Sequence, residues 1–303
     1  MKKSYLLFVA LLIVCSLFFS CNVNSGVQPE KLFIVTSNFS AYDFARQLCG
    51  DLAEIVQLIP FGSESHSYEP TPKDIMNISK CDLFICVGGE SESWIDKILD
   101  SIDTPINTIK MIESVDLLEI EHEHQGHSVD YDEHVWTSIS NCKKIISDIS
   151  KKIKELDPEN TLSYNVATEL YYRKLEKLDS EFKEFFQTRS KKILIFGDRF
   201  PFAYFANEYD LECYCAYPGC GSETMPDPTS VMFLIDKIRN EGISTVFYIE
   251  FSNHTVADSI AEETDTKTAL LHSCHNVTKD EFESGETYIS LMKKNLETLK
   301  GAL

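Results

Sequence analysis

The sequence is poor in basic residues and, beyond its first twenty residues, in long apolar runs. Among its 303 residues, 28 are Lys or Arg and 48 are Asp or Glu, which gives a formal net charge of −20 at pH 7. A surface with this excess of acid repels phosphate backbones, so we expect no nucleic-acid partner. The shortage of apolar runs excludes a membrane protein with several spans. The remaining composition, 25% charged and 43% hydrophobic, is typical of a folded globular chain.

Several catalytic signatures are also missing. No HExxH spacing supports a zinc hydrolase, and no nucleophile elbow or Cys/His signature supports covalent catalysis. The spacing of Cys213, Cys215 and Cys220 lacks the paired CxxC units of a structural zinc site. We therefore expect no enzyme, and we expect the cysteines to form disulfides or buried thiols rather than a metal site.

The first twenty residues have the pattern of a secretory signal. A basic start precedes an apolar run over residues 5–19, which ends before Cys21. A Cys at this point resembles the lipid-bearing first residue of a bacterial lipoprotein, with a plain signal peptide or an uncleaved anchor as the alternatives. We predict a signal peptide over residues 1–20, lipidation of Cys21, and a polar tether over residues 21–30 that attaches the protein to the outside of a bacterial membrane.

Two α/β segments follow, separated by one long helical pattern. In each segment, short apolar runs alternate with helical patterns, which predicts an α/β fold of two lobes, each a mostly parallel sheet covered by helices. We assign the N-terminal lobe to residues 31–156 and the C-terminal lobe to residues 189–303. The expected strands cover residues 32–36, 55–59, 83–87, 193–196, 245–249 and 268–271.

Residues 157–188 are expected to form one long backbone helix that joins the lobes. Asp157 and Pro158 make a favourable helix start, and apolar residues then recur at helical spacing without an interrupting Gly or Pro. Thirty helical residues span about 45 Å, more than one small domain requires. The alternative is a long surface helix within a single domain.

Imidazole and carboxylate side chains follow the expected strands, at the edge where open α/β sheets bind ligands. Such groups from separate strands, meeting in one cleft, make a Zn²⁺ or Mn²⁺ site. Each group alone is equally compatible with a hydrogen-bonded loop residue. The candidate ligands after strands are His66, Asp198, Glu250, His272 and His275, and a further candidate, His134, precedes the helix expected over residues 137–156.

A further group of histidines lies in the segment 119–127. His122, His124 and His127 are interleaved with acidic residues there, which favours a flexible, low-affinity collector of cations. The alternative is a solvated polar loop. The segment 119–127 lies shortly before His134 in the sequence, and this position favours the interpretation as a cation collector.

Three motifs of this chain resemble motifs of a known protein family, and the resemblance extends over essentially the whole mature chain. Residues 66–72 are similar to a first ligand motif, and residues 88–90 with Trp94 are similar to a glycine-rich loop before a helix. Residues 132–136 resemble a second ligand motif, with Glu133 in place of Pro. The family is that of the substrate-binding lipoproteins of bacterial zinc/manganese ABC importers (cluster A-I, zinc-type), whose His-rich insertion the 119–127 segment resembles.

The resemblance implies a function in transport. The chain is expected to capture a divalent ion, Zn²⁺ or alternatively Mn²⁺, as a monomer and to deliver it to the membrane permease of an ABC importer. Nitrogen-rich ligation favours zinc, whereas ligation by Asp198 or Glu250 would weaken that preference. The alternative functions are an exported zinc-dependent hydrolase and a surface adhesin that retains the fold.

The chain departs from the family at two ligand positions. Where the family has a third His, this chain has Asp198-Arg199, and a guanidinium cannot bind a cation. Either Asp198 replaces this histidine as the ligand, or Arg199 orients a carboxylate beside the metal site. Where the family has an acid after its last strand, this chain offers His272 and His275, and we expect one of them to bind.

Two cysteines fall in loops near the same expected cleft. For Cys220 and Cys274 we predict a disulfide, although the sequence alone does not give connectivity.

Overall fold

The computed structural model describes residues 31–64, 68–120, 130–217 and 226–303. Within these ranges, no helix combines the length and the apolar character needed to cross a membrane. The predicted signal peptide and tether lie outside the described residues, as do Cys21, His66, His122, His124, His127 and Cys220.

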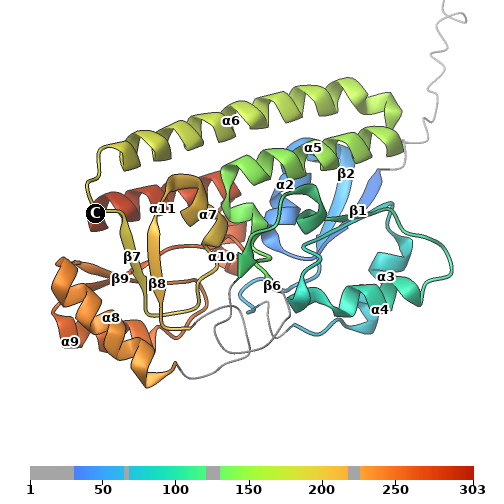
Figure 1. The fold of residues 1–303 in the computed structure, drawn as a ribbon. Helices are drawn as coiled ribbons and strands as arrows, with labels where there is room; N and C mark the ends of the chain where they lie inside the picture. The colour runs from blue at the N-terminus through green and yellow to red at the C-terminus, as the bar shows by residue number, and fades with distance from the viewer. Residues whose placement is uncertain (1–30, 65–67, 121–129, 218–225) are drawn as a thin grey trace, which may run out of the picture. The chain divides into compact units, whose positions relative to one another are not determined.

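The first half of the chain forms a four-stranded parallel sheet with the order β2-β1-β3-β4. Its strands β1 and β2 are labelled in Figure 1. Its inner strands are almost fully buried, as expected for apolar runs in a sheet covered on both faces. The strands are β1 (Leu32–Thr36), β2 (Ala53–Gln57), β3 (Leu83–Cys86) and β4 (Thr108–Lys110). The α-helices of this half are α2 (Phe39–Cys49), α3 (Pro72–Lys80), α4 (Trp94–Asp100) and α5 (Ile139–Leu156).

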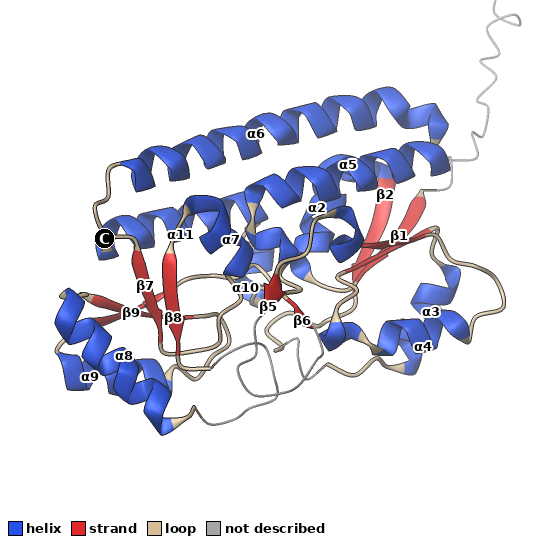
Figure 2. Cartoon of the chain, in the orientation of Figure 1, coloured by secondary structure: helices blue, strands red, loops and turns tan. Residues whose placement is uncertain are grey.

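The second half repeats the arrangement with the order β10-β9-β7-β8, again all parallel. Figure 2 labels β7, β8 and β9 of this sheet. Its strands are β7 (Ile193–Phe196), β8 (Glu212–Cys215), β9 (Thr245–Tyr248) and β10 (Lys267–Leu270). Its helices are α7 (Ala203–Tyr209), α8 (Pro228–Glu241), α9 (Thr255–Thr264), α10 (Lys279–Glu283) and α11 (Tyr288–Ala302). Two parallel sheets covered by helices confirm the predicted fold class.

Shorter elements connect these parts. β5 (Glu119–Ile120) and β6 (Asp130–Tyr131) form a small antiparallel pair. The 3₁₀ turns are η1 (Gly50–Leu52), η2 (Glu90–Glu92), η3 (Met111–Ser114), η4 (Val135–Thr137) and η5 (Pro158–Asn160).

The long helix predicted between the two halves is α6 (Thr161–Gln187), with 27 residues. It begins slightly later than predicted, because the segment after Asp157 first forms η5. The Asp157 carboxylate accepts a hydrogen bond from the Tyr164 hydroxyl at 2.6 Å, which fixes the start of the helix. α6 lies beside α5, where the hydroxyl oxygens of Ser150 and Thr168 are 2.8 Å apart.

One continuous core connects the two halves. Ile34 of β1 and Phe196 of β7 belong to the same buried cluster, together with Tyr288 of α11. The Tyr288 amide donates to Asp43 Oδ2 at 2.9 Å, and its hydroxyl donates to the carbonyl of Trp136 at 2.8 Å. These buried bonds tie α11 both to α2 and to η4.

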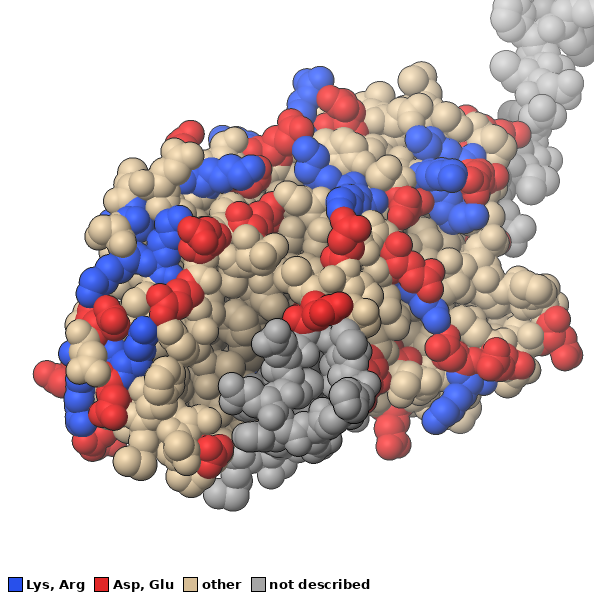
Figure 3. Space-filling view, viewed as in Figure 1, with Lys and Arg blue, Asp and Glu red and all other residues tan. Residues whose placement is uncertain are grey.

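Charges of both signs are mixed over the face drawn in Figure 3. One ion pair, Lys143 to Glu176 at 2.9 Å, joins α5 to α6. Because such exposed pairs contribute only about 0–1 kcal/mol, the core rather than surface charge holds these helices together.

Candidate metal centre

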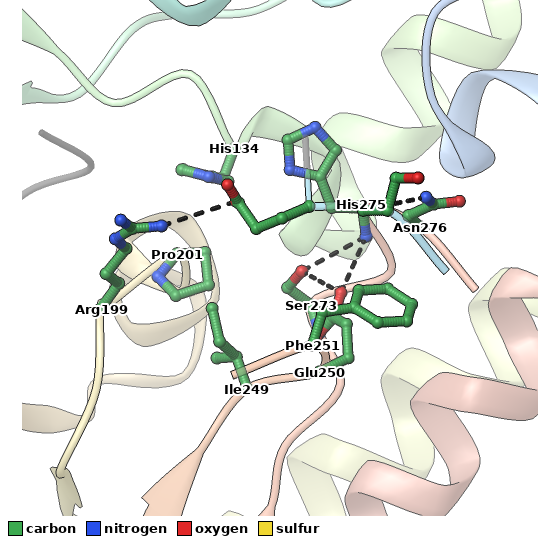
Figure 4. Close-up of a pocket in the computed structure, with 11 residues that line it drawn as sticks. His134, Arg199, Pro201, Ile249, Glu250, Phe251, Ser273, His275 and Asn276 are labelled. Atoms are coloured by element: carbon green, nitrogen blue, oxygen red, sulfur yellow. Dashed lines mark hydrogen bonds and ion pairs between the residues drawn. The ribbon is translucent and has the colours of Figure 1, made fainter. Parts of the chain in front are cut away.

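A small cleft lies at the carboxyl ends of the strands of the second sheet, against loops of the first half (Figure 4). Its volume of about 20 Å³ suffices for one ion or one water molecule. The residues that line it include Ser63, Glu64, His134, Arg199, Glu250 and His275.

His134 reaches the cleft from the turn between β6 and η4 and is only 1% exposed. Its Nδ1 atom lies 3.2 Å from Oδ1 of Asp132, and its main-chain amide donates to the same oxygen at 2.8 Å. A carboxylate on Nδ1 fixes that nitrogen as the protonated one and makes Nε2 the nitrogen suited to a metal.

His275 reaches the cleft from the loop after β10, and this loop is held by the first half of the chain. The carbonyl of His275 accepts from the Phe39 amide at 3.0 Å, and the carbonyl of Cys274 accepts from the Ser40 hydroxyl at 2.6 Å. Both donors belong to the start of α2. The indole of Trp136 donates to the Ser273 carbonyl at 2.8 Å.

The loop also stores backbone strain. Cys274 has a φ of 62°, in the left-handed region that a residue with a side chain rarely adopts. Strain of this kind persists where surrounding contacts fix the conformation, and it is common at functional sites.

The structure brings His134 and His275 together. Their ring centres are 5.9 Å apart, and the rings are nearly perpendicular at 84°. Two imidazoles that share one tetrahedral Zn²⁺, with Zn–N bonds of ~2.1 Å, place their ring centres about 5 Å apart. The ring centres of His134 and His275 are therefore about an ångström farther apart than in such a site.

His272 is placed differently and does not line the cleft. Its Nδ1 accepts from the Cys274 amide at 2.9 Å, and Nε2 lies 4.0 Å from Oε1 of Glu281. Its main chain exchanges two hydrogen bonds with the Asn295 side chain. Of the two alternatives, the structure places His275 at the cleft.

The carboxylates of Asp198 and Glu250 are engaged by main-chain amides. Asp198 accepts from its neighbour Arg199 at 2.8 Å and from Ile249 at 3.1 Å. Glu250 accepts from the amide and hydroxyl of Ser273 at 2.7 and 2.5 Å, and from the His275 amide at 3.3 Å. Both acids thus shape the walls of the cleft.

Within the described ranges, no three His, Cys, Asp or Glu side chains gather closely enough to hold a metal ion. The described part supplies two imidazoles, and a third is predicted at His66. The loop before His66 is tied to the His275 loop, because Asn276 Nδ2 donates to the carbonyls of Pro60 and Ser63 at 2.7 and 2.9 Å. The role of His66 stays a prediction.

Cys274 is fully buried, and burial raises the pKa of its thiol well above the usual range. A thiol that stays protonated is a poor metal ligand. Because Cys220 lies outside the described residues, the predicted disulfide stays a prediction. Further cysteines of the described part are buried thiols, as one of the two sequence interpretations expects: Cys49, Cys81, Cys86 and Cys142.

Glu133, which replaces a Pro of the resembled motif, supports the neighbouring loop. Its carboxylate accepts from the Ser91 amide at 3.1 Å. A Cβ atom at Gly89 would lie 1.9 Å from Oε2 of Glu133, so only glycine fits there. Glu133 is thus accommodated in place of Pro by its contacts with Ser91 and Gly89, next to His134.

Sequence reasoning missed Glu64. This residue lines the cleft and forms an ion pair with Arg199, in which Nη1 of Arg199 and Oε1 of Glu64 are 3.5 Å apart. The available signal was an acid two positions before His66.

Two helix-covered parallel sheets that share a small, histidine-lined cleft define the substrate-binding class of fold. Within that class, the chain belongs to the family described as zinc-uptake complex component A, periplasmic, whose model matches residues 34–302.

Individual relatives agree with this assignment. The chain is 30% identical to the zinc-binding lipoprotein AdcA of Streptococcus pneumoniae over 99% of this chain and 61% of that protein. It is 31% identical to the high-affinity zinc uptake system protein ZnuA of Bacillus subtilis, over 90% of this chain and 88% of that protein. The chain thus spans 61% of the length of the first curated relatives it matches.

A solved structure agrees as well. The zinc-bound ZnuA-like domain of the S. pneumoniae AdcA superposes with a TM-score of 0.76 at 28% identity, over 90% of this chain and 99% of that one.

Proposed function

We propose that this protein captures a divalent metal ion outside the cytoplasm and passes it to the permease of an ABC importer. Zn²⁺ is the ion that the site supports best, and Mn²⁺ is the alternative. The observation that carries the proposal is the pair His134 and His275, which line one cleft from opposite halves of the chain. Their ring centres are 5.9 Å apart. The names of the relatives, a zinc-binding lipoprotein and a zinc uptake protein, support the choice of zinc.

Capture fits the cleft better than catalysis. A catalytic zinc keeps one position open for water and needs room for a substrate beside it. A cavity of about 20 Å³ accommodates about one water-sized species. The carboxylate of Glu250, which could otherwise act as a general base, is engaged by Ser273 and His275. An exported hydrolase is therefore disfavoured.

The remaining parts of the proposal concern the N-terminal segment, the other histidines and the organisation of the chain. We propose that residues 1–20 are removed, that Cys21 carries a lipid, and that residues 21–30 tether the protein to the membrane. The histidines His122, His124 and His127 are proposed to collect cations near the cleft, and His66 to join His134 and His275 on the ion. We further propose that the protein acts as a monomer with lobes at residues 31–156 and 189–303, joined by a linking helix at residues 157–188.

The test is zinc affinity, measured by competition with a chromogenic chelator. His134→Ala and His275→Ala are each expected to weaken zinc binding by at least about 100-fold, because each removes a direct ligand. The control is His254→Ala, since His254 is 46% exposed and pairs with Asp258 away from the cleft. If both cleft variants bind zinc as the wild type does, the proposed site is wrong. A metal-free protein that retains no zinc on dialysis would favour the adhesin alternative.

A further inference from the structure

The loop that carries His275 belongs to the second half of the chain by sequence, but it is hydrogen-bonded to the first half along its length. Each of the five residues from Ser273 to Val277 has a partner there. In order, these partners are the Trp136 indole at 2.8 Å, the Ser40 hydroxyl at 2.6 Å, the Phe39 amide at 3.0 Å, the Pro60 carbonyl at 2.7 Å and the Gly62 amide at 2.8 Å. His134 also comes from the first half. His134 and His275 are therefore held on a common frame.

Asn276 makes the central side-chain contacts between this loop and the first half. It lines the cleft (Figure 4), and its side chain is buried, with 1% of the residue exposed. Its Nδ2 donates to the carbonyls of Pro60 and Ser63 at 2.7 and 2.9 Å. Its Oδ1 accepts from Nε2 of Gln57 at 3.0 Å and from the Val277 amide at 2.9 Å. The amide side chain thus uses both its donors and both its acceptor positions.

The chemistry of an amide is needed at this position. A carboxylate has no donor for the two carbonyls, and an aliphatic side chain leaves the carbonyls and the Gln57 amide without this partner. Buried polar groups without a partner are costly, so the loops are expected to shift apart when the amide is lost. Because His275 is the residue next to Asn276, such a shift moves the imidazole relative to His134.

We propose that Asn276 is a positioning residue of the metal site, which holds His275 opposite His134 before the ion arrives. This inference rests on the proposed function. The two ring centres, 5.9 Å apart, need to approach by about an ångström to share one zinc ion. A loop that is already fixed loses little conformational freedom on binding, so the bonds of Asn276 increase the affinity for the ion. The alternative is a side chain that stabilises the fold without influencing the ion.

The test is the zinc affinity of Asn276→Leu, measured by competition with a chromogenic chelator. Leucine has a similar size but forms none of the four hydrogen bonds, so zinc should bind roughly 10–100-fold more weakly. The matched control is Asn295→Leu. Asn295 is 3% exposed and exchanges two hydrogen bonds with the main chain of His272, which does not line the cleft. The control should bind zinc within about twofold of the wild type, since it changes an independent site. Equal losses of affinity in both variants would overturn the proposal.

A double-mutant cycle separates positioning from a general loss of stability. If Asn276 acts through His275, Asn276→Leu weakens zinc binding in the wild-type background but has little further effect in His275→Ala, where the ligand is already gone. A general loss of stability would weaken binding alike in both backgrounds. Equal fold-changes in the two backgrounds would therefore contradict the assigned role.

Melting temperatures of the metal-free variants verify that they are folded. Should Asn276→Leu not fold, Asn276→Ser takes its place, because serine is smaller and keeps one hydroxyl donor. It is expected to bind zinc more weakly than the wild type. A folded Asn276→Ser variant with wild-type affinity would overturn the proposal.

The outcomes also separate this inference from the proposed function. If the wild type binds zinc, His275→Ala loses it and Asn276→Leu keeps the wild-type affinity, the proposed function stands and only the role of Asn276 is wrong. If the wild type binds no zinc, both are wrong.

Discussion

The side chain of Asp132 holds His134 at two points, accepting from its main-chain amide at 2.8 Å and contacting its Nδ1 at 3.2 Å. Both side chains are buried, with 4% and 1% exposed. In this low-dielectric setting the carboxylate fixes which ring nitrogen carries the proton. The imidazole is thereby oriented before any ion arrives.

Asp132→Asn tests this orientation. The amide preserves the shape but loses the charge that favours a proton on Nδ1, so the ring can adopt the other tautomer. Zinc affinity is expected to fall by roughly 10–100-fold while the fold is retained. Chelator competition measures the affinity, and circular dichroism verifies the fold. Zinc affinity equal to that of the wild type would mean that Asp132 does not set the tautomer.

Glu250→Gln tests the support of the His275 loop. The new NH₂ group faces the amides of Ser273 and His275, so at least one hydrogen bond to this loop is lost. The free energy of unfolding is expected to fall by about 1–3 kcal/mol, with a parallel loss of zinc affinity. The control is Glu262→Gln on the exposed face of α9. A loss of stability as small as in the control would contradict the role given to Glu250.

Glu92 makes stability depend on pH. Burial raises the pKa of its carboxyl from 4.5 to about 7, although the amides of Val87 and Gly88 donate to it. The folded protein therefore binds this proton more tightly than the unfolded chain does. Stability is expected to fall as pH rises from about 4.5 to 7 and to stay lower above that window.

Glu92→Gln removes this pH dependence. The variant should be more stable than the wild type at pH 8, by on the order of 1–3 kcal/mol, and the difference should vanish near pH 4.5. Denaturant unfolding at both pH values measures it, with Glu113→Gln, an exposed acid of η3, as control. A difference that is constant with pH, or larger in acid, would show that Glu92 is ionised in the folded state.

The sheets could be predicted because their inner strands are continuous apolar runs, as in β1 and β3. The short edge strands β4 and β8 were missed, since three or four residues such as Thr108–Lys110 carry no distinctive pattern. The helix α6 was predicted correctly, but the spacing of its apolar residues did not identify which face of the helix is buried. Leu162 is 75% exposed, whereas Tyr164 and Tyr171 are buried.

The same limit applies to the cleft. A strand end indicated the 272–275 segment, and the place before an expected helix indicated His134. The choice between His272 and His275 depends on the turn at Cys274, whose left-handed φ no sequence pattern predicts. Likewise, the engagement of Glu250 by main-chain amides and the pairing of Glu64 with Arg199 arise from loops that meet only in three dimensions.

The most direct test of the account is the anomalous diffraction of zinc in crystals of the zinc-loaded protein. We predict one strong peak between His134 and His275, at about 2.1 Å from a nitrogen of each ring. A zinc peak elsewhere, with neither of these imidazoles within bonding distance, would contradict it.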